Sequence, residues 1–467
     1  MVAPIDRIPP EILALIPDFW ETDERDQDVI TLTHVCRAWR DIFISRSSLW
    51  ADIRCDDREK SLVYFERSRS SPISLSLYRD RPILPHDPFF EIIPHAIDRL
   101  VSLFIQGAPE NLQDITGHFC HPAPLLKELT IRSINKHRNN VLPPALLNGD
   151  LSSLHTLYLE SVRTELPWRN MVNLTSFTLG QMSSGEVSVR QLLDFFEDAP
   201  HLRNINLYSI TLTPGAKDGR VVTPGCLKKM AIVDCGPPSA LLDHLFIPVG
   251  AILTMQADLT GSLAGEIFPR SIDNLRNFSD FTTIQLSGGG PNPQMKFGGP
   301  NGRVNVILTN TRVEGTRLVL ESLAQLDTSK TEQLVIERGQ SRTRECLHQA
   351  LLPMTNLRTL TLSKCWSPQI FIQALQPGTS SSEVVVCPKL EELIVVPLLG
   401  GGSSGIMAVI GMAAARALRG MKLGTVRIGC REDEFNPSCV SELREHTCHV
   451  ECDPELVWLT VDTDEED

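Results

Sequence analysis

The sequence predicts an α+β chain, in which a small helical module precedes an irregular α/β solenoid with parallel strands on its concave face. Three observations predict this. Apolar residues near the N-terminus recur at helical spacing. From Leu125 onward a short apolar phrase recurs, and helix-length segments separate many of its copies. We expect a helical module over residues 1–55, a connecting cap over 56–124, the solenoid over 125–460 and an acidic disordered tail over 461–467.

The first helix is expected to open at Pro9 and Pro10. Proline is tolerated in a first turn because its missing N–H would be unpaired there anyway. Ile12, Leu13 and Ile16 then fall on one face of the helix.

A second helix is expected from Val29 to Phe43, after a charged linker over residues 21–28. Its apolar stripe has helical spacing and comprises Leu32, Val35, Cys36, Trp39 and Phe43. A turn over residues 47–50 then ends in Leu49 and Trp50. Periodicity alone does not distinguish a stripe that packs on the chain's own core from one that binds another protein, so both interpretations stay open.

Three blocks of this segment, Ile8–Leu13, Leu32–Arg40 and Leu49–Trp50, together resemble an F-box, in the form abundant among proteins of mushroom-forming fungi. The resemblance implies a three-helix module that docks on the Skp adaptor of an SCF (Skp–cullin–F-box) ubiquitin ligase. The partner-binding residues that it implies are Ile8, Pro9, Ile12, Leu13, Ile16, Leu32, Val35, Cys36, Trp39, Leu49 and Trp50. Pro17 stands where the family usually has a large apolar residue. Because proline inside a helix costs about 3 kcal/mol, we expect the first helix to kink or stop near Ile16.

The recurring phrase reads apolar–x–x–apolar–x–apolar. We identify ten copies, which start at Leu126, Leu154, Leu174, Leu202, Leu227, Ile252, Phe281, Leu357, Leu390 and Leu423. Most steps lie near the ~20–29 residues of leucine-rich repeats. The resemblance implies the same arrangement, because F-box proteins of this fungal type often have degenerate leucine-rich repeats after the F-box. The series is interrupted between Leu286 and Leu357, where residues 288–293 and 298–302 are expected to be turns that flank an irregular hairpin or loop.

Helices are expected between the phrases, over residues 189–199, 346–352, 369–375 and 406–418. Before the first phrase, Leu62, Tyr64, Ile73, Leu75 and Leu77 suggest one or two strands, and residues 96–103 suggest a helix followed by a strand.

Candidates for chemistry are few. A cysteine and histidine cluster near the C-terminus lacks a C-x₂-C pair, and alternation favours a last strand over residues 449–452. Its members are Cys430, Cys439, His446, Cys448, His449 and Cys452. The trio His118, Cys120 and His121 lies in a proline-marked loop, and the glycine-rich segment 400–405 lacks the lysine of a phosphate loop. We therefore expect no catalytic residue, no cofactor and no metal site.

The charge balance is 44 basic against 57 acidic residues, a net charge of −13. Nucleic-acid binding and membrane-surface attachment both favour clustered cations, so neither is expected. The longest apolar stretch, residues 406–418, is too short and too interrupted to span a membrane. The first residues lack the basic and apolar regions of a secretion signal. We therefore expect the twelve cysteines to remain thiols, in the cytoplasm, the nucleus or both.

The expected function is that of a non-catalytic adaptor, which holds the Skp adaptor, and through it a cullin, with one surface and an unknown protein substrate with the solenoid. The alternative is a leucine-rich-repeat scaffold whose F-box has decayed at Pro17. A hydrolase hidden in the α/β body is the third hypothesis, disfavoured because no catalytic motif is present.

Overall fold

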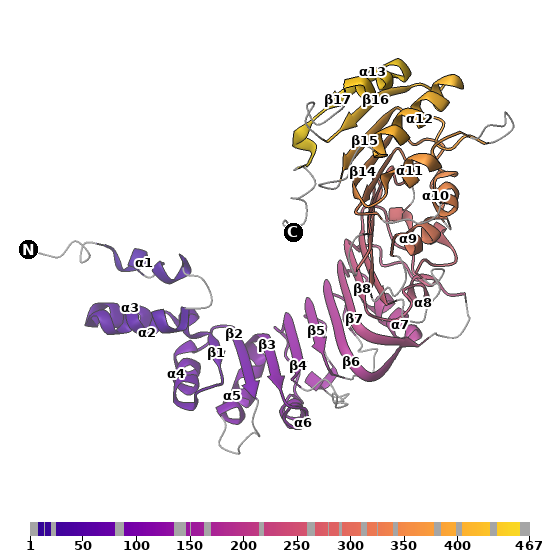
Figure 1. Cartoon of the computed structure of the whole chain (residues 1–467). Helices are drawn as coiled ribbons and strands as arrows, with labels where there is room; N and C mark the ends of the chain where they lie inside the picture. The colour runs from indigo at the N-terminus through magenta and orange to yellow at the C-terminus, as the bar shows by residue number, and fades with distance from the viewer. Residues whose placement is uncertain are drawn as a thin grey trace, which may run out of the picture. The chain divides into compact units, whose positions relative to one another are not determined.

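Figure 1 shows the computed structural model of the chain. The residues that it describes are 8–13, 15–19, 25–79, 88–134, 146–149, 151–162, 170–213, 219–258, 267–278, 280–288, 292–309, 315–324, 326–339, 344–377, 384–397, 404–429 and 437–457. The chain folds as two compact units. Unit 1 comprises Met1–Ile205 with Ser209–Thr211, and unit 2 comprises Asn206–Tyr208 with Leu212–Asp467. Strand β7 (Asn204–Thr213) is divided between them.

Short helices open unit 1. They are α1 (Pro10–Leu13), η2 (Ile16–Phe19), α2 (Arg25–Val35), α3 (Arg37–Ser45) and η3 (Ser47–Trp50). The first helix, which was predicted to kink or stop near Ile16, ends earlier, at Leu13. Pro17 is buried in the 3₁₀ turn η2. Part of the expected charged linker, residues 25–28, already belongs to α2.

The single helix predicted from Val29 to Phe43 is wrong, because Cys36 interrupts it with extended backbone (φ −159°, ψ 174°). The Arg40 Nε–H donates to the carbonyl of Thr33, 2.9 Å away, and so satisfies an acceptor in the last turn of α2. The apolar spacing continues across Cys36, so periodicity alone could not reveal the break.

Unit 1 continues as strands alternating with helices. In chain order they are β1 (Asp52–Arg54), α4 (Arg58–Ser68), β2 (Ile73–Arg79), α5 (Pro88–Ala96), η4 (Ile97–Arg99), β3 (Leu100–Gly107), α6 (Pro109–Gly117), β4 (Glu128–Ser133), η5 (Leu146–Gly149), β5 (Thr156–Glu160), β6 (Ser176–Ser188) and α7 (Val189–Asp198). Strands β1 to β6 pair in parallel, each with the next along the chain. Residues 56–124, expected as a connecting cap, thus supply β2 and β3 to the same ladder as β4.

Helix α4 occupies a segment where a strand was suggested by Leu62 and Tyr64. The carboxylate of Asp57 caps it by accepting the backbone N–H of Lys60 at 2.8 Å. Its buried residues are Ser61, Tyr64 and Ser68, a helical spacing of three and four. Because two of the three are serines, an apolar pattern did not reveal the helix.

Unit 2 is built in the same way. After β7 its elements are β8 (Lys229–Val233), α8 (Ser239–Leu242), β9 (Ile252–Asp258), η7 (Ile272–Asn274), η8 (Arg276–Phe278), β10 (Thr283–Ser287), β11 (Gln294–Gly299), β12 (Gly302–Thr309), α9 (Gly315–Leu323), β13 (Gln333–Glu337), α10 (Arg344–Leu351), β14 (Thr359–Cys365), α11 (Pro368–Ala374), β15 (Glu392–Pro397), α12 (Ser404–Leu418), β16 (Leu423–Ile428), α13 (Pro437–His446), β17 (Thr447–Cys452) and η10 (Pro454–Val457). The helices predicted over 189–199, 346–352, 369–375 and 406–418 are confirmed as α7, α10, α11 and α12.

An antiparallel insertion interrupts the parallel ladder of unit 2. Strand β12 pairs in parallel with β9, β11 pairs antiparallel with both β12 and β10, and β10 pairs in parallel with β13. The β11–β12 hairpin lies in the expected irregular segment. Of the expected turn at 288–293, residues 289–291 lie outside the described residues.

The recurring phrase marks the buried face of the sheet. In nine of its ten copies all three apolar side chains are buried. The copy at Ile252 is placed wrongly, because Leu253 and Met255 are the residues that align with Met230 and Ile232 of β8. Gly250 stands at the first phrase position there, so the apolar template slipped by two residues.

Several copies escaped the sequence pattern, and two of them show how. Thr331, Leu334 and Ile336 form one on β13, where a buried threonine takes the first apolar position. The other matches the pattern fully, and its residues are Leu100, Leu103 and Ile105 on β3.

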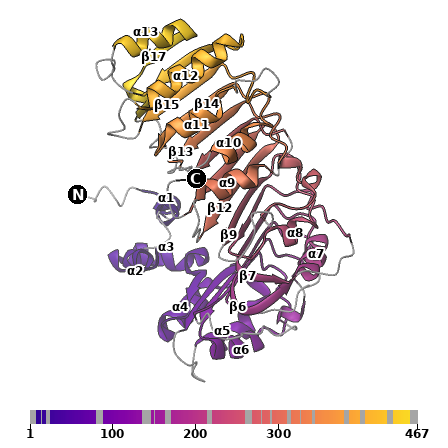
Figure 2. The same ribbon diagram turned by 45° about the vertical axis from the view of Figure 1, so that its right-hand side comes forward.

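Helices cover one face of the strands in each unit. In unit 1, α4, α5 and α6 lie along one face of β1 to β4 (Figure 1). In unit 2, α9 to α13 pack side by side along one face of the sheet (Figure 2). We call the opposite face of each unit its open face. No helix among the described residues combines the length and the apolar composition that a membrane span requires.

Candidate protein-interaction surfaces

The structure divides the eleven expected partner-binding residues by burial. The buried ones are Leu13, Leu32, Leu49 and Trp50. The exposed ones are Pro9, Ile12, Val35 and Cys36, and those of intermediate exposure are Ile8, Ile16 and Trp39. The N-terminal module therefore has both an apolar interior and apolar side chains that face solvent.

Trp50 is the main anchor of the interior. Its indole Nε1–H donates to the carbonyl of Phe43 at 2.9 Å, which ties η3 to α3. Its ring packs edge-on against Tyr64 of α4, with ring centroids 4.9 Å apart. The guanidinium of Arg67 covers it at 4.4 Å from the ring centroid. Part of the predicted apolar stripe thus belongs to the chain's own core.

Among the described residues of the module, three large apolar side chains remain outside that core. Ile12, Leu15 and Val35 are exposed over 54 %, 44 % and 57 % of their surface. Single exposed apolar residues are common on protein surfaces. Three in one short module make it a candidate surface for another protein.

A second candidate surface lies on the open face of unit 1. We call it the aromatic cluster and define it as Tyr78 on β2, Phe104 on β3, Arg132 on β4, and Tyr158 and Glu160 on β5. The register brings these residues together, because Ser76, Phe104, Thr130, Tyr158 and Thr178 align across five neighbouring strands. The rings of Tyr78 and Phe104 lie 4.9 Å apart between centroids, and half of the Tyr78 surface is exposed.

Arg132, Tyr158 and Glu160 form a closed polar triangle within this cluster. The Arg132 Nε–H donates to Glu160 Oε2 at 2.8 Å, and Nη2 donates to the Tyr158 hydroxyl at 2.9 Å. That hydroxyl donates in turn to Glu160 Oε2 at 2.9 Å. The pKa of Arg132 is raised, first by the hydrogen bond to Tyr158 and then by attraction to Glu160. The triangle holds three side chains in fixed positions on the open face.

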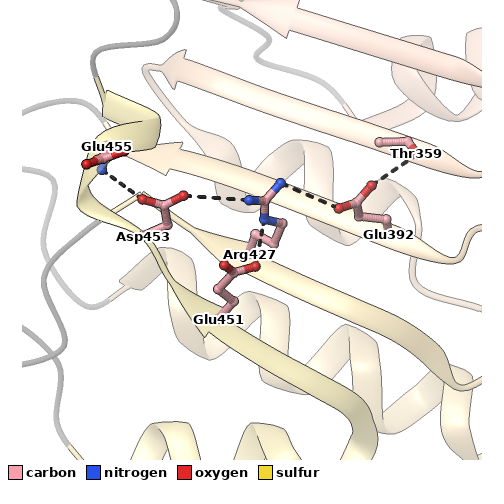
Figure 3. Close-up of polar contacts among 6 residues, drawn as sticks. All are labelled: Thr359, Glu392, Arg427, Glu451, Asp453 and Glu455. Carbon is pink, nitrogen blue, oxygen red and sulfur yellow. Dashed lines mark hydrogen bonds and ion pairs between the residues drawn. The ribbon is translucent and has the colours of Figure 1, made fainter.

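A polar cluster lies on the open face of unit 2 (Figure 3). Arg427 on β16 donates to Glu451 on β17 at 2.9 Å, and it lies 4.0 Å from Glu392 and 3.6 Å from Asp453. The Thr359 hydroxyl, on β14, donates to Glu392 at 3.3 Å. Three carboxylates thus share one guanidinium, and the cluster carries a net negative charge.

The histidines and cysteines that the sequence offered as candidate metal ligands are not gathered in the described part of the chain. His118 packs its ring on Phe90, with centroids 4.6 Å apart, and the Cys120 thiol donates to the Gly117 carbonyl. Residues 447–452 form β17, as the alternation predicted, while Cys430 lies outside the described residues. Nowhere among the described residues do three His, Cys, Asp or Glu side chains group as metal ligands. Most of the glycine-rich segment 400–405 also lies outside the described residues.

Two buried cysteines are poor nucleophile candidates. Burial raises the pKa of the Cys365 and Cys387 thiols to about 12 each. Both therefore stay protonated near neutral pH, and the thiolate is the reactive form.

Sequence reasoning missed the aromatic cluster. Tyr158 was visible as an aromatic residue at a variable position of its phrase. Phe104 could have been found with it, because the unrecognised phrase that starts at Leu100 places Phe104 at the equivalent position. Tyr78 carried a weaker signal, because Pro72 stands at the first position of its phrase.

Comparisons with known proteins add no family. No protein-family model matches the chain, and no curated protein gives a significant match.

Proposed function

We propose that the chain is a substrate-recognition adaptor of an SCF-type ubiquitin ligase. In this proposal the N-terminal F-box module docks the Skp adaptor, and through it a cullin, while a leucine-rich-repeat solenoid holds a protein substrate. The observation that carries the proposal is the division of the expected contact residues into a buried set and an exposed set. A docking module needs both, one to fold and one to bind.

The recurring phrase supports the second half of the proposal. Parallel strands whose buried residues align from one phrase to the next, with helices on one face, are typical of repeat solenoids. The open face then offers a broad surface for a folded or extended substrate. Ubiquitin transfer would be carried out by other subunits, and this chain would act by raising the local concentration of the substrate.

The test is calorimetric titration of the full chain with the Skp adaptor. We expect the variant with Ile12→Asp and Val35→Asp to bind at least about a hundredfold more weakly, because two apolar contacts are lost and two charges are introduced. Leu13 is unsuitable for this purpose because it is buried, so its replacement would disturb folding.

Leu418→Asp is the matched control, since Leu418 is an apolar helix residue of unit 2 that is 89 % exposed. It should bind like the wild type. Absence of adaptor binding by folded wild-type protein would remove the adaptor proposal.

The second candidate function is a leucine-rich-repeat scaffold with a decayed F-box. It is favoured by the early end of α1 at Leu13 and by the burial of Pro17 in η2. In that case the wild type would not bind the Skp adaptor and Pro17→Leu would gain binding, because leucine restores a backbone N–H and permits a longer helix.

A further inference from the structure

Aromatic rings on the open face of unit 1 lie among short side chains. Tyr78 and Phe104 are flanked along the sheet by the short side chains of Ser76, Ser102 and Thr130. Neighbouring strands are about 4.8 Å apart, so Phe104 and Tyr158, two strands apart, are separated by about 10 Å with only Thr130 between their backbones. Tyrosine and arginine are enriched among the residues that dominate binding at protein interfaces.

On the β1 side of these rings Asp52 and Arg54 carry one charge of each sign, and on the β4 side the charges favour a cation. Arg132 is neutralised by Glu160 through the polar triangle. Glu128, beside Thr130 on β4, accepts a hydrogen bond from the Ser102 hydroxyl at 3.1 Å, and no cation among the described residues pairs with it. Glu128 is exposed, and among the described residues no cation compensates its negative charge.

We propose that the aromatic cluster with Glu128 is a docking site for an extended protein segment that carries lysine or arginine. The aliphatic part of such a side chain packs on Tyr78 and Phe104, whose ring faces attract its cationic end. Glu128 pairs with the cation. The inference deepens the proposed function and rests on it, because it names the chemistry of the substrate segment.

Long-range electrostatics act in the same direction. The chain carries a net charge of −13, which attracts basic segments and repels acidic ones before contact. Charge pairs of this kind raise the association rate and lose strength as salt is added.

The test uses the full chain and labelled peptides of about twelve residues in which proline alternates with arginine, glutamine or glutamate. Proline keeps each peptide extended without a preference for pairing as a strand. Binding is followed by fluorescence anisotropy at low and high salt. We expect the arginine peptide to bind about tenfold more tightly than the glutamine peptide, and the glutamate peptide to bind most weakly.

Two variants test the site itself. The double variant Tyr78→Ala with Phe104→Ala should bind the arginine peptide about tenfold more weakly, and Glu128→Gln should weaken binding severalfold and flatten its salt dependence. The matched controls are Trp366→Ala, which removes an exposed aromatic ring of unit 2, and Glu391→Gln, which removes an exposed carboxylate of unit 2. Both should bind like the wild type.

The outcomes separate this inference from the adaptor proposal. Equal binding of arginine and glutamate peptides, no peptide binding by folded protein, or unchanged binding in the Tyr78 and Phe104 variant would each overturn it. Loss in the Glu391 control equal to that in Glu128→Gln would attribute binding to net charge and would also overturn it. The same preparations are titrated with the Skp adaptor, which the cluster variants should still bind. Failure of adaptor binding alone would refute the proposed function and leave the docking site standing.

Discussion

Among the described residues, Arg416 is the one whose charge is most fully removed from solvent. It has no exposed surface, its Nη1 and Nη2 donate to the carbonyls of Val386 and Cys387 at 3.0 and 2.8 Å, and its Nε has no partner in the described part of the chain. Burial lowers its pKa. This guanidinium is buried and bonded to carbonyls, and no carboxylate among the described residues pairs with it. Its retention indicates that fixing residues 386–387 against α12 offsets a substantial desolvation cost.

Replacement of this residue should therefore destabilise the protein. We expect Arg416→Met to lower the free energy of unfolding by about 1–3 kcal/mol, because the carbonyl of Val386 loses its hydrogen-bond partner while the apolar volume is kept. Arg416→Lys should also destabilise, since one ammonium group cannot reproduce the two-pronged contact. Urea unfolding measures both. Arg444→Met, at an exposed arginine of α13, is the control and should change stability little. A stable Arg416→Met variant would show that the carbonyl contacts contribute nothing.

At the scale of elements, the predictable strands were those whose three phrase positions all hold apolar residues. The pattern failed where another residue type took a buried position, as Thr331 does just before β13 and Ser61 and Ser68 do on α4. It also failed at Cys36, where the chain turns from α2 to α3 without breaking the apolar spacing. Ser61 and Ser68 donate to backbone carbonyls, and a pattern of hydrophobicity does not show such hydrogen bonds. The other two misses differ, because the Thr331 hydroxyl has no hydrogen-bond partner among the described residues and Cys36 makes no side-chain cap.

Replacement of glycine by alanine should have opposite effects on stability in the β11–β12 hairpin and in α12. Gly302 has φ +139°, and a Cβ placed there would lie 2.7 Å from the Ala251 carbonyl oxygen. Gly302→Ala should destabilise by about 1–3 kcal/mol, because both backbone strain and a backbone clash oppose it. Gly411 lies inside α12 with open space at its Cβ position, so Gly411→Ala should stabilise by about 0.5–1 kcal/mol. Thermal unfolding of the two variants compares them directly, and effects of the same sign would refute the assignment of their backbone environments.

At the scale of the whole molecule, the candidate surfaces were predictable to different degrees. The N-terminal surface could be predicted because its residues are adjacent in sequence and follow a helical period. The burial of Trp50 and the exposure of Val35 could not be predicted, since they depend on how α3 and η3 pack on α4. The aromatic cluster draws on four strands spread over residues 73–160, so only the register of the sheet brings its members together.

The architecture of each unit leads to a prediction about cooperativity. Each described strand pairs only with its immediate neighbours in the sheet, so a cavity should destabilise the strands beside it most. Leu362 on β14 and Leu157 on β5 have no exposed surface, and replacement of either by alanine should cost about 2–5 kcal/mol. Hydrogen exchange read by mass spectrometry should then accelerate around β13–β15 of unit 2 for Leu362→Ala, and around β4–β6 of unit 1 for Leu157→Ala. Ile53→Val on β1 is a mild control that removes one methylene from unit 1 and should leave the exchange of unit 2 unchanged. Equal acceleration in both units by either alanine variant would mean that the chain unfolds as one cooperative body, because the energy of each strand would then depend on the whole sheet rather than on its neighbours.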